Sequence, residues 1–465
     1  MVSRLVDGRA AIARFLPGGA VLLSALTFGS YLMGLVRDRI FARTFGAGAE
    51  LDAYNAAFVL PELTLDVLVA SGLAAPFVPI FLQLRRDEGH AGAEAFGQTI
   101  FSAAVLVMGA AAVVMFVLAP QTASFIAPGF AAGQRDLYVA LFRTMLVTPV
   151  IFAASLALGE VLLAERRFLA YGIAPLMYNA GIVVGTVALS DRVGIFGPAI
   201  GAVLGAVLHL GVRLWGLRRS RFSVRPRLAV RTRAVGEFVR LMLPKMAGHP
   251  IEPATFLYFT AVATTVGAGS VTSVSFARNF QSVPVSLVGV AFSVAAFPAL
   301  AAAYAAGERR RFLRILTANL VTVSLLTAAA AVALFAVSSV AIGVLLGGDA
   351  FDAAAVARTS LVLSAFAISV PFESLTHLLS RAIYATRHTL LQVVSSLAGL
   401  GVTVVATAVI TPRIGIAGIP LGFAIGTAAK VVLLGIVLAW RLAASRARPV
   451  SDVPDGSDGE RATSG

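Results

Sequence analysis

Long uninterrupted runs of apolar residues dominate this sequence, as in Val105–Pro120 and Leu169–Ser190. A helix that crosses a membrane needs about 20 such residues, whereas the strands of a membrane barrel would alternate apolar and polar residues. Hydrophobic residues make up 58% of the chain and charged residues only 13%, which leaves too few charges to cover a soluble surface. The sequence therefore predicts an all-α integral membrane protein.

The apolar runs divide into about twelve predicted transmembrane helices. They cover residues 16–42, 51–84, 98–119, 137–164, 169–190, 193–217, 237–263, 270–303, 312–346, 353–385, 388–411 and 414–440. Prolines inside the longer runs, among them Pro61, Pro76 and Pro284, predict bent or broken helices.

Arginines mark every second connection between these helices. Clusters occur at Arg85–Arg86, Arg166–Arg167, 218–233 and 309–311, with Arg387 in the equivalent place, while the other connections carry the single arginines Arg43, Arg135, Arg192 and Arg413. The positive-inside rule places the clustered arginines in the cytoplasm, and both chain termini with them. The sequence thus predicts a multi-pass membrane protein with both termini in the cytoplasm.

The most basic segment, 218–233, holds seven arginines in sixteen residues. A connection between two membrane halves commonly collects such residues, so we expect a cytoplasmic linker (218–236) against anionic membrane lipids and no nucleic-acid partner. Polar residues then dominate 441–465, which we expect to be a disordered cytoplasmic tail.

The sequence predicts no cofactor, no metal site and no enzymatic activity. The chain has no cysteine and five histidines without metal-ligand spacing. Neither a nucleotide-binding loop nor a Ser/His/Asp grouping stands out. Transport would then be driven by a gradient, the membrane potential or substrate flux.

An internal repeat divides the chain into two halves. RVGIFGPAIG at 192–201 matches RIGIAGIPLG at 413–422 in five of ten positions, at an offset of 221 residues. The same offset aligns Gly46–Gly48 with Gly267–Gly269. We therefore predict two parallel six-helix lobes, 1–217 and 237–440, an architecture in which transporters bind substrate between the halves.

Ionisable residues inside the predicted helices are the candidate binding residues, because charge within a membrane is costly and usually functional. They gather at equivalent places in both halves, with a further pair at Glu373 and His377. The candidate substrate-binding residues are Arg37, Asp38, Arg39, Asp52, Asn55, Glu62, Asp66, Lys245, Glu252, Arg278 and Asn279. An alternative for Arg37, Asp38 and Arg39 is that they only neutralise one another.

The first hairpin resembles the MurJ/MviN lipid II flippases of the MOP exporter superfamily. The resemblance rests on Arg37–Asp38, Phe45–Gly48, Asp52–Tyr54, Leu60–Pro61 and Phe77–Pro79. It implies a V-shaped, MATE-like bundle with alternating access and an arginine-lined cavity for a lipid diphosphate.

Carried over by position, the resemblance assigns Arg37, Asp38 and Asp52 to the site. The family arginine of the eighth helix falls on Asn279, one residue from Arg278. The chain departs from the family at Leu65–Asp66, where an arginine pair is usual, and in having twelve rather than fourteen helices.

The leading hypothesis is a flippase for an undecaprenyl-diphosphate-linked saccharide, with lipid II for peptidoglycan synthesis as the first candidate. The surplus of carboxylates motivates an alternative, a proton- or cation-coupled multidrug-type exporter of the same superfamily. A scaffold without transport activity is the third hypothesis. The sequence leaves the coupling ion or proton open.

Overall fold

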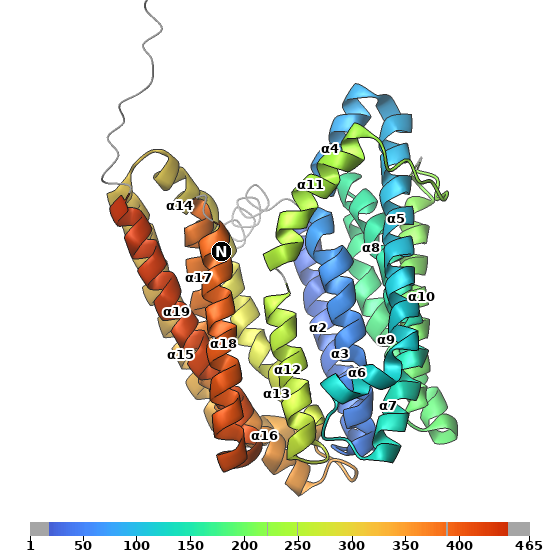
Figure 1. The fold of residues 1–465 in the computed structure, drawn as a ribbon, viewed down its shortest axis with the longest axis vertical. Helices are drawn as coiled ribbons and strands as arrows, with labels where there is room; N and C mark the ends of the chain where they lie inside the picture. Colours follow the sequence, from blue (N-terminus) through green and yellow to red (C-terminus); the bar gives the residue numbers. More distant parts are fainter. Residues whose placement is uncertain (1–17, 221, 249, 387–388, 445–465) are drawn as a thin grey trace, which may run out of the picture. The chain divides into compact units, whose positions relative to one another are not determined.

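The computed structural model describes residues 18–220, 222–248, 250–386 and 389–444, and within them all regular elements are helical (Figure 1). The predicted tail lies almost wholly outside the described residues. The first half contains α2 (Gly18–Phe45), α3 (Ala49–Leu65), η1 (Asp66–Ala70), α4 (Ser71–Asp87), α5 (Gly89–Val117), α6 (Ala119–Ile126), α7 (Ala132–Met145), α8 (Val147–Ala164), α9 (Phe168–Val193) and α10 (Phe196–Leu217). The second half contains α11 (Arg233–Gly248), α12 (Ile251–Val266), α13 (Ser270–Pro284), η2 (Val285–Val290), α14 (Ala291–Ala305), α15 (Arg309–Leu346), α16 (Ala353–Ala367), α17 (Ser369–Ala385), α18 (Thr389–Ile414), η3 (Gly415–Ala417) and α19 (Gly418–Ala444).

The predicted repeat is confirmed by the positions of the helix ends. Adding 221 to the bounds of α9 gives the bounds of α18, and adding it to the start of α7 gives the start of α16. Both halves interrupt the second helix of the repeat with a π-helical turn, η1 and η2. Gly194 and its equivalent Gly415 both have positive φ, as a glycine can adopt freely. The two halves thus share their turns and breaks as well as their helices.

The twelve predicted spans are all occupied by helix in the described part of the chain. Eight helices there, or up to nine if the bent pair α16–α17 is one span, are long and apolar enough to cross a membrane. That number treats residues 390–443 as one segment, although η3 turns the chain between α18 and α19. The count of eight does not include α2. Nor does it include α11 and α12, two shorter helices on either side of residue 249.

The described residues fold into two compact units. Unit 1 contains the chain up to Phe280 together with Leu334–Phe366 and Thr407–Leu421, and unit 2 contains Gln281–Ala333, Ala367–Ala406 and the chain from Gly422. Aromatic residues form much of the core of unit 1, including Phe77, Phe81, Phe96 and Phe238. Leucine and alanine predominate around Phe312 in unit 2. Unit 1 continues past the predicted linker through α11 and α12, so the boundaries of the two lobes remain a prediction.

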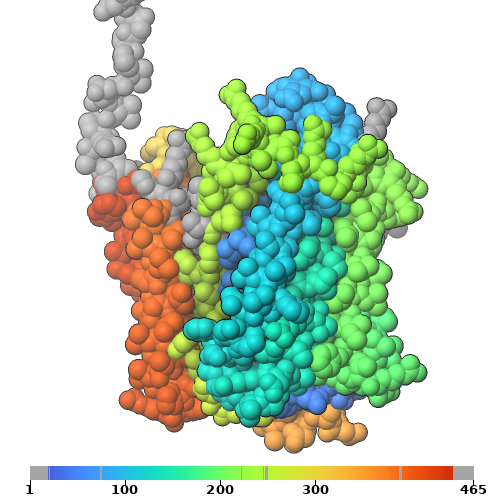
Figure 2. Space-filling model, turned by 45° about the vertical axis from the view of Figure 1, so that its right-hand side comes forward, coloured from blue at the N-terminus to red at the C-terminus, as the bar shows by residue number. Residues whose placement is uncertain are grey.

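The basic segment 222–232 is attached to unit 1 along α5 (Figure 2). The Phe222 side chain is buried in the core of unit 1. The backbone amides of Ser223 and Arg227 donate to the Glu94 carboxylate (2.7 Å) and to Ser102 Oγ (2.9 Å). The segment is therefore packed on the protein through its backbone, while the Arg225 and Arg227 side chains are exposed.

Glycines bring α9 and α10 into backbone contact. A Cβ atom built on Gly185 would lie 2.3 Å from Gly201 Cα, and one built on Gly181 would lie 2.3 Å from Gly205 Cα. Such approach of small residues is a common means of packing membrane helices, because lipid offers no hydrophobic drive for association. The contact fixes α9, which packs in turn against α2.

Candidate functional site

Arg37 and Asp38 form the centre of the charged cluster on α2. The Arg37 guanidinium donates to Asp38 Oδ1 from Nε (3.1 Å) and Nη2 (2.8 Å), and from Nη1 to Asn179 Oδ1 on α9 (3.2 Å). Arginine has five N–H donors, so two remain beyond these three bonds. The Arg37 side chain is 25% exposed and that of Asp38 only 5%. The Arg37 guanidinium is therefore fixed by Asp38 and Asn179 and still has N–H donors for a further partner.

Asn279 of the second half completes this cluster. Its amide donates to Asp38 Oδ2 at 2.7 Å, so the Asp38 carboxylate joins Arg37 on α2 to α13. The neighbouring Arg278 instead contacts α12, with Nη2 3.8 Å from the Glu252 carboxylate and its guanidinium 4.6 Å from the centre of the Phe256 ring. One position along a helix rotates a side chain by about 100°. For this reason Asn279, and not Arg278, joins the Arg37 cluster in unit 1.

Arg39 lies apart from Arg37 despite being two positions away. Its Nη1 donates to the carbonyl oxygens of Val344 (2.8 Å) and Leu345 (2.9 Å), in the last turn of α15. The final carbonyls of a helix have no partner within it and attract cations. Arg39 thus stabilises the end of another helix.

Asp52 is enclosed at the start of α13. Its carboxylate accepts hydrogen bonds from the Gly269 amide (2.6 Å), the Thr272 amide (2.8 Å) and the Thr272 hydroxyl (2.7 Å), and the residue is 0% exposed. Asn55 on the same face of α3 donates to the same hydroxyl (3.3 Å). A helix start carries unpaired amides, and here a carboxylate from a different helix satisfies them.

Arg358 reinforces this junction between the halves. It donates from Nη2 to the Ala47 carbonyl (3.1 Å) and from Nη1 to the Ala268 carbonyl (2.8 Å). These are the equivalent central residues of the two repeated Gly-Ala-Gly turns. One guanidinium therefore connects the repeated turns of both halves within unit 1.

Glu62 and Asp66 lie one turn apart where α3 passes into η1. Glu62 is exposed and lies within electrostatic range of Arg37 and Asp66. Widened π-helical turns such as η1 recur at functional sites. Lys245 belongs to α11, but its side chain lies outside the described residues.

A second polar cluster, whose residues are not among the candidates predicted from the sequence, is buried between α8, α9 and α10. Ser155 Oγ and His209 Nδ1 are 2.7 Å apart. The Arg213 guanidinium lies 4.2 Å from the centre of the Tyr171 ring and within electrostatic range of Glu160. Arg213 is 2% and Glu160 5% exposed. The spacing of His209 and Arg213, one helical turn apart in an apolar run, was the available signal.

In unit 2, Glu373 is likewise buried and accepts a hydrogen bond from Gln281 Nε2 (2.8 Å). Arg381, two turns further along α17, donates to Ser293 Oγ (3.0 Å). Among the described residues no group of three or more acidic or histidine side chains could hold a metal ion.

Comparison with known proteins identifies the family. The family model described as lipid II flippase MurJ matches residues 41–452. The lipid II flippase MurJ of Burkholderia cenocepacia is 25% identical over 427 residues, which cover 90% of this chain and 83% of that protein. A probable lipid II flippase MurJ of Thermotoga maritima is 27% identical over 414 residues, covering 88% and 82%.

Solved structures agree on the fold. A lipid II flippase MurJ in an inward closed conformation superposes with a TM-score of 0.78 at 21% identity, covering 90% of this chain and 87% of that one. An inward-facing multidrug MATE transporter of the MOP superfamily reaches the same TM-score at 14% identity, covering 90% and 95%. The fold is thus shared by both kinds of transporter, and the family match distinguishes them. The chain belongs to the lipid II flippase MurJ family.

Proposed function

We propose that this protein translocates an undecaprenyl-diphosphate-linked saccharide, lipid II in the first place, between the leaflets of the bacterial cytoplasmic membrane. The arrangement of Arg37 carries the proposal. The residue belongs to the Arg-Asp motif on which the sequence resemblance rests, keeps two donors beyond its bonds to Asp38 and Asn179, and is partly exposed. A guanidinium with donors in a fork suits the oxygens of a diphosphate.

Asp38 is the partner of the Arg37 guanidinium when no cargo is bound. Entry of a diphosphate replaces the carboxylate on the Arg37 fork, and Asp38 keeps its hydrogen bond from Asn279. Arg37 joins Asn179 on α9 and, through Asp38, Asn279 on α13, so the exchange breaks this hydrogen-bonded chain between the two halves at Arg37. Binding of the cargo is thereby coupled to the helices that must move.

Alternating access requires that the junction around Asp52 and Arg358 open. In this conformation the cap on α13 and the bonds to Ala47 and Ala268 hold the two repeated turns together. Opening exposes the Asp52 carboxylate and frees the carbonyls that Arg358 now binds. The free energy for this step comes from cargo binding together with a cation or proton taken up by Glu62 and Asp66.

The proposal includes the orientation and the lipid contacts of the chain. The clustered arginines and both termini face the cytoplasm, in keeping with the positive-inside rule. The exposed arginines of segment 222–232 lie against anionic lipids of that leaflet.

Complementation tests the function. The gene should restore growth to a strain depleted of its own lipid II flippase, and Arg37→Ala should remove the rescue at equal protein levels. Arg192→Ala, which changes an exposed arginine at the end of α9, should rescue as the unmodified gene does. Drug efflux without rescue would assign the chain to the exporter class, and rescue by Arg37→Ala would remove the site.

A further inference from the structure

The turn between α8 and α9 is strained at Arg166. The amides of Arg166 and Arg167 donate to the carbonyls of Leu163 (3.0 Å) and Leu162 (2.8 Å), which is the Schellman pattern that ends many helices. The residue in the left-handed position of that pattern is usually glycine. Here it is Arg166, with φ of 59°. A non-glycine residue in the left-handed conformation is strained, and such strain is found most often at functional sites.

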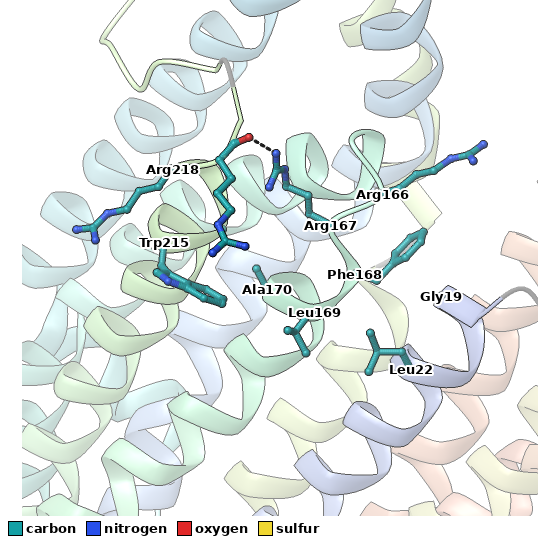
Figure 3. Close-up of a pocket in the computed structure, with 11 residues that line it drawn as sticks. Gly19, Leu22, Arg166, Arg167, Phe168, Leu169, Ala170, Trp215 and Arg218 are labelled. Carbon is teal, nitrogen blue, oxygen red and sulfur yellow. Dashed lines mark hydrogen bonds between the residues drawn. The ribbon is translucent and has the colours of Figure 1, made fainter.

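Arg166 lines a pocket that is rich in arginine (Figure 3). The cavity measures about 490 Å³ and is also lined by Arg167, Arg218 and Arg219. Glu165 is the nearby carboxylate, and it is engaged by Arg167 (3.3 Å) and Arg85 (3.8 Å). Arg167 also donates to the carbonyl of Arg219. The pocket is therefore strongly cationic, with one guanidinium fixed in place.

The other wall of the pocket is apolar and reaches the surface. Leu22 at the start of α2, Leu169 on α9 and Trp215 on α10 line it, and Leu169 and Trp215 are 46% and 52% exposed. Figure 3 shows these three side chains below the arginines. Tryptophan is characteristic of the interface between membrane and water. Charge on one side and an exposed apolar wall on the other suit an amphipathic anion.

We propose that this pocket binds one anionic phospholipid. Its phosphate lies on Arg167 and the neighbouring arginines, and an acyl chain leaves along Leu169 and Trp215 into the bilayer. The apolar exit and the position at the clustered-arginine end favour a membrane lipid over a free phosphate. The bound lipid links the first turns of α2, the helix of Arg37, to the ends of α8 and α10.

Native mass spectrometry of the purified full chain with added phosphatidylglycerol or phosphatidylcholine tests the site. Arg218→Gln/Arg219→Gln should weaken phosphatidylglycerol binding about 25-fold, since each arginine at an anionic surface contributes about fivefold (~1 kcal/mol). Phosphatidylcholine binding should not change. Arg192→Gln at the far end of α9 should retain both affinities. Equal phosphatidylglycerol affinity in the double variant and the unmodified protein would overturn the site.

Arg166→Gly separates binding from folding. Glycine relaxes the left-handed turn, so the lipid-free variant should unfold at the same temperature as the parent or above it, yet bind phosphatidylglycerol about fivefold more weakly. Undiminished lipid binding by this variant would contradict the assignment. If undecaprenyl-diphosphate binding falls while phosphatidylglycerol binding stays, the pocket holds the cargo and the proposal is wrong. These readouts do not depend on transport, so the site stands or falls separately from the flippase function.

Discussion

At the scale of single residues, the charges on α2 have different partners although they are adjacent in sequence. Arg37 and Asp38 pair with each other and reach α9 and α13, whereas Arg39 binds the end of α15. The sequence identified all three as candidates, but it could not assign their partners, since these depend on tertiary packing. In the same way Asp52 looked like a cavity residue and is fully enclosed as a helix cap.

Replacing Arg37 by lysine tests whether binding of the diphosphate needs the planar guanidinium group or only its positive charge. Lysine keeps the charge but has no planar fork with which to bind Asn179 and the oxygens of a diphosphate together. We expect affinity for lipid II to fall about tenfold, or ~1.4 kcal/mol, with little change in the unfolding temperature. Arg192→Lys should leave the affinity unaltered. Equal binding by Arg37→Lys and the parent would show that charge alone suffices.

The buried Arg213 and Glu160 allow a test of pairing by a double-mutant cycle. Arg213→Leu alone should destabilise the protein, by at most the ~3–5 kcal/mol of a broken buried ion pair, because it removes the cation within electrostatic range of the buried Glu160 carboxylate. Arg213→Leu/Glu160→Leu should recover most of that loss. Unfolding in denaturant provides the free energies. Glu160→Leu is measured alone as well. If the losses from the two single variants add up to the loss in the double variant, the two side chains do not interact.

At the scale of helices, caps and close contacts decide the positions of the candidate side chains. Asn179 can hold Arg37 because glycines press α9 against α10 and α9 packs against α2. The predicted helices were right because apolar length is a local signal. Of the prolines expected to bend or break helices, Pro284 lies at the end of α13, whereas Pro61 and Pro76 lie inside α3 and α4. The capping of α13 by Asp52 on α3 was not predictable, since it joins residues 217 positions apart.

Removing the cap on α13 should loosen its first turn. Asp52→Ala leaves the amides of Gly269 and Thr272 without a partner, at a cost of about 1–3 kcal/mol each. We expect faster hydrogen exchange at these amides and a lower unfolding temperature. Asp191→Ala, at an exposed carboxylate of α9, is the matched control. Unchanged exchange around Thr272 would show that the cap contributes little.

At the scale of the whole molecule, the repeat was the most informative feature of the sequence. The offset of 221 residues, visible in a few short matches, recurs in the ends of helices and in the π-helical turns. The charged residues themselves are not repeated at this offset. The equivalent of Asp52 is Ser273, and the equivalent of Arg213 is Leu434. The repeat thus predicts the architecture that the two halves share. The candidate site is found where the residues of the two halves differ.

The orientation in the membrane can be measured with single cysteines, because the chain has none of its own. A cysteine beside Arg225 should resist a membrane-impermeant reagent in intact cells and react after permeabilisation. A cysteine beside Gly194, at a connection with one arginine, should react in intact cells. The reverse pattern would invert the topology.

If Arg37 binds the diphosphate of the cargo, a change of charge at or near Arg37 must change the affinity for lipid II. Lipid II binding to the purified protein and to Arg37→Glu and Asp66→Arg is the most direct measurement. Arg37→Glu should lose binding, since it adds a carboxylate beside Asp38, whereas Asp66→Arg should bind more tightly, since it places a family-like cation near Glu62. If Arg37→Glu binds lipid II as tightly as the unmodified protein and Asp66→Arg changes nothing, the diphosphate site is not at Arg37.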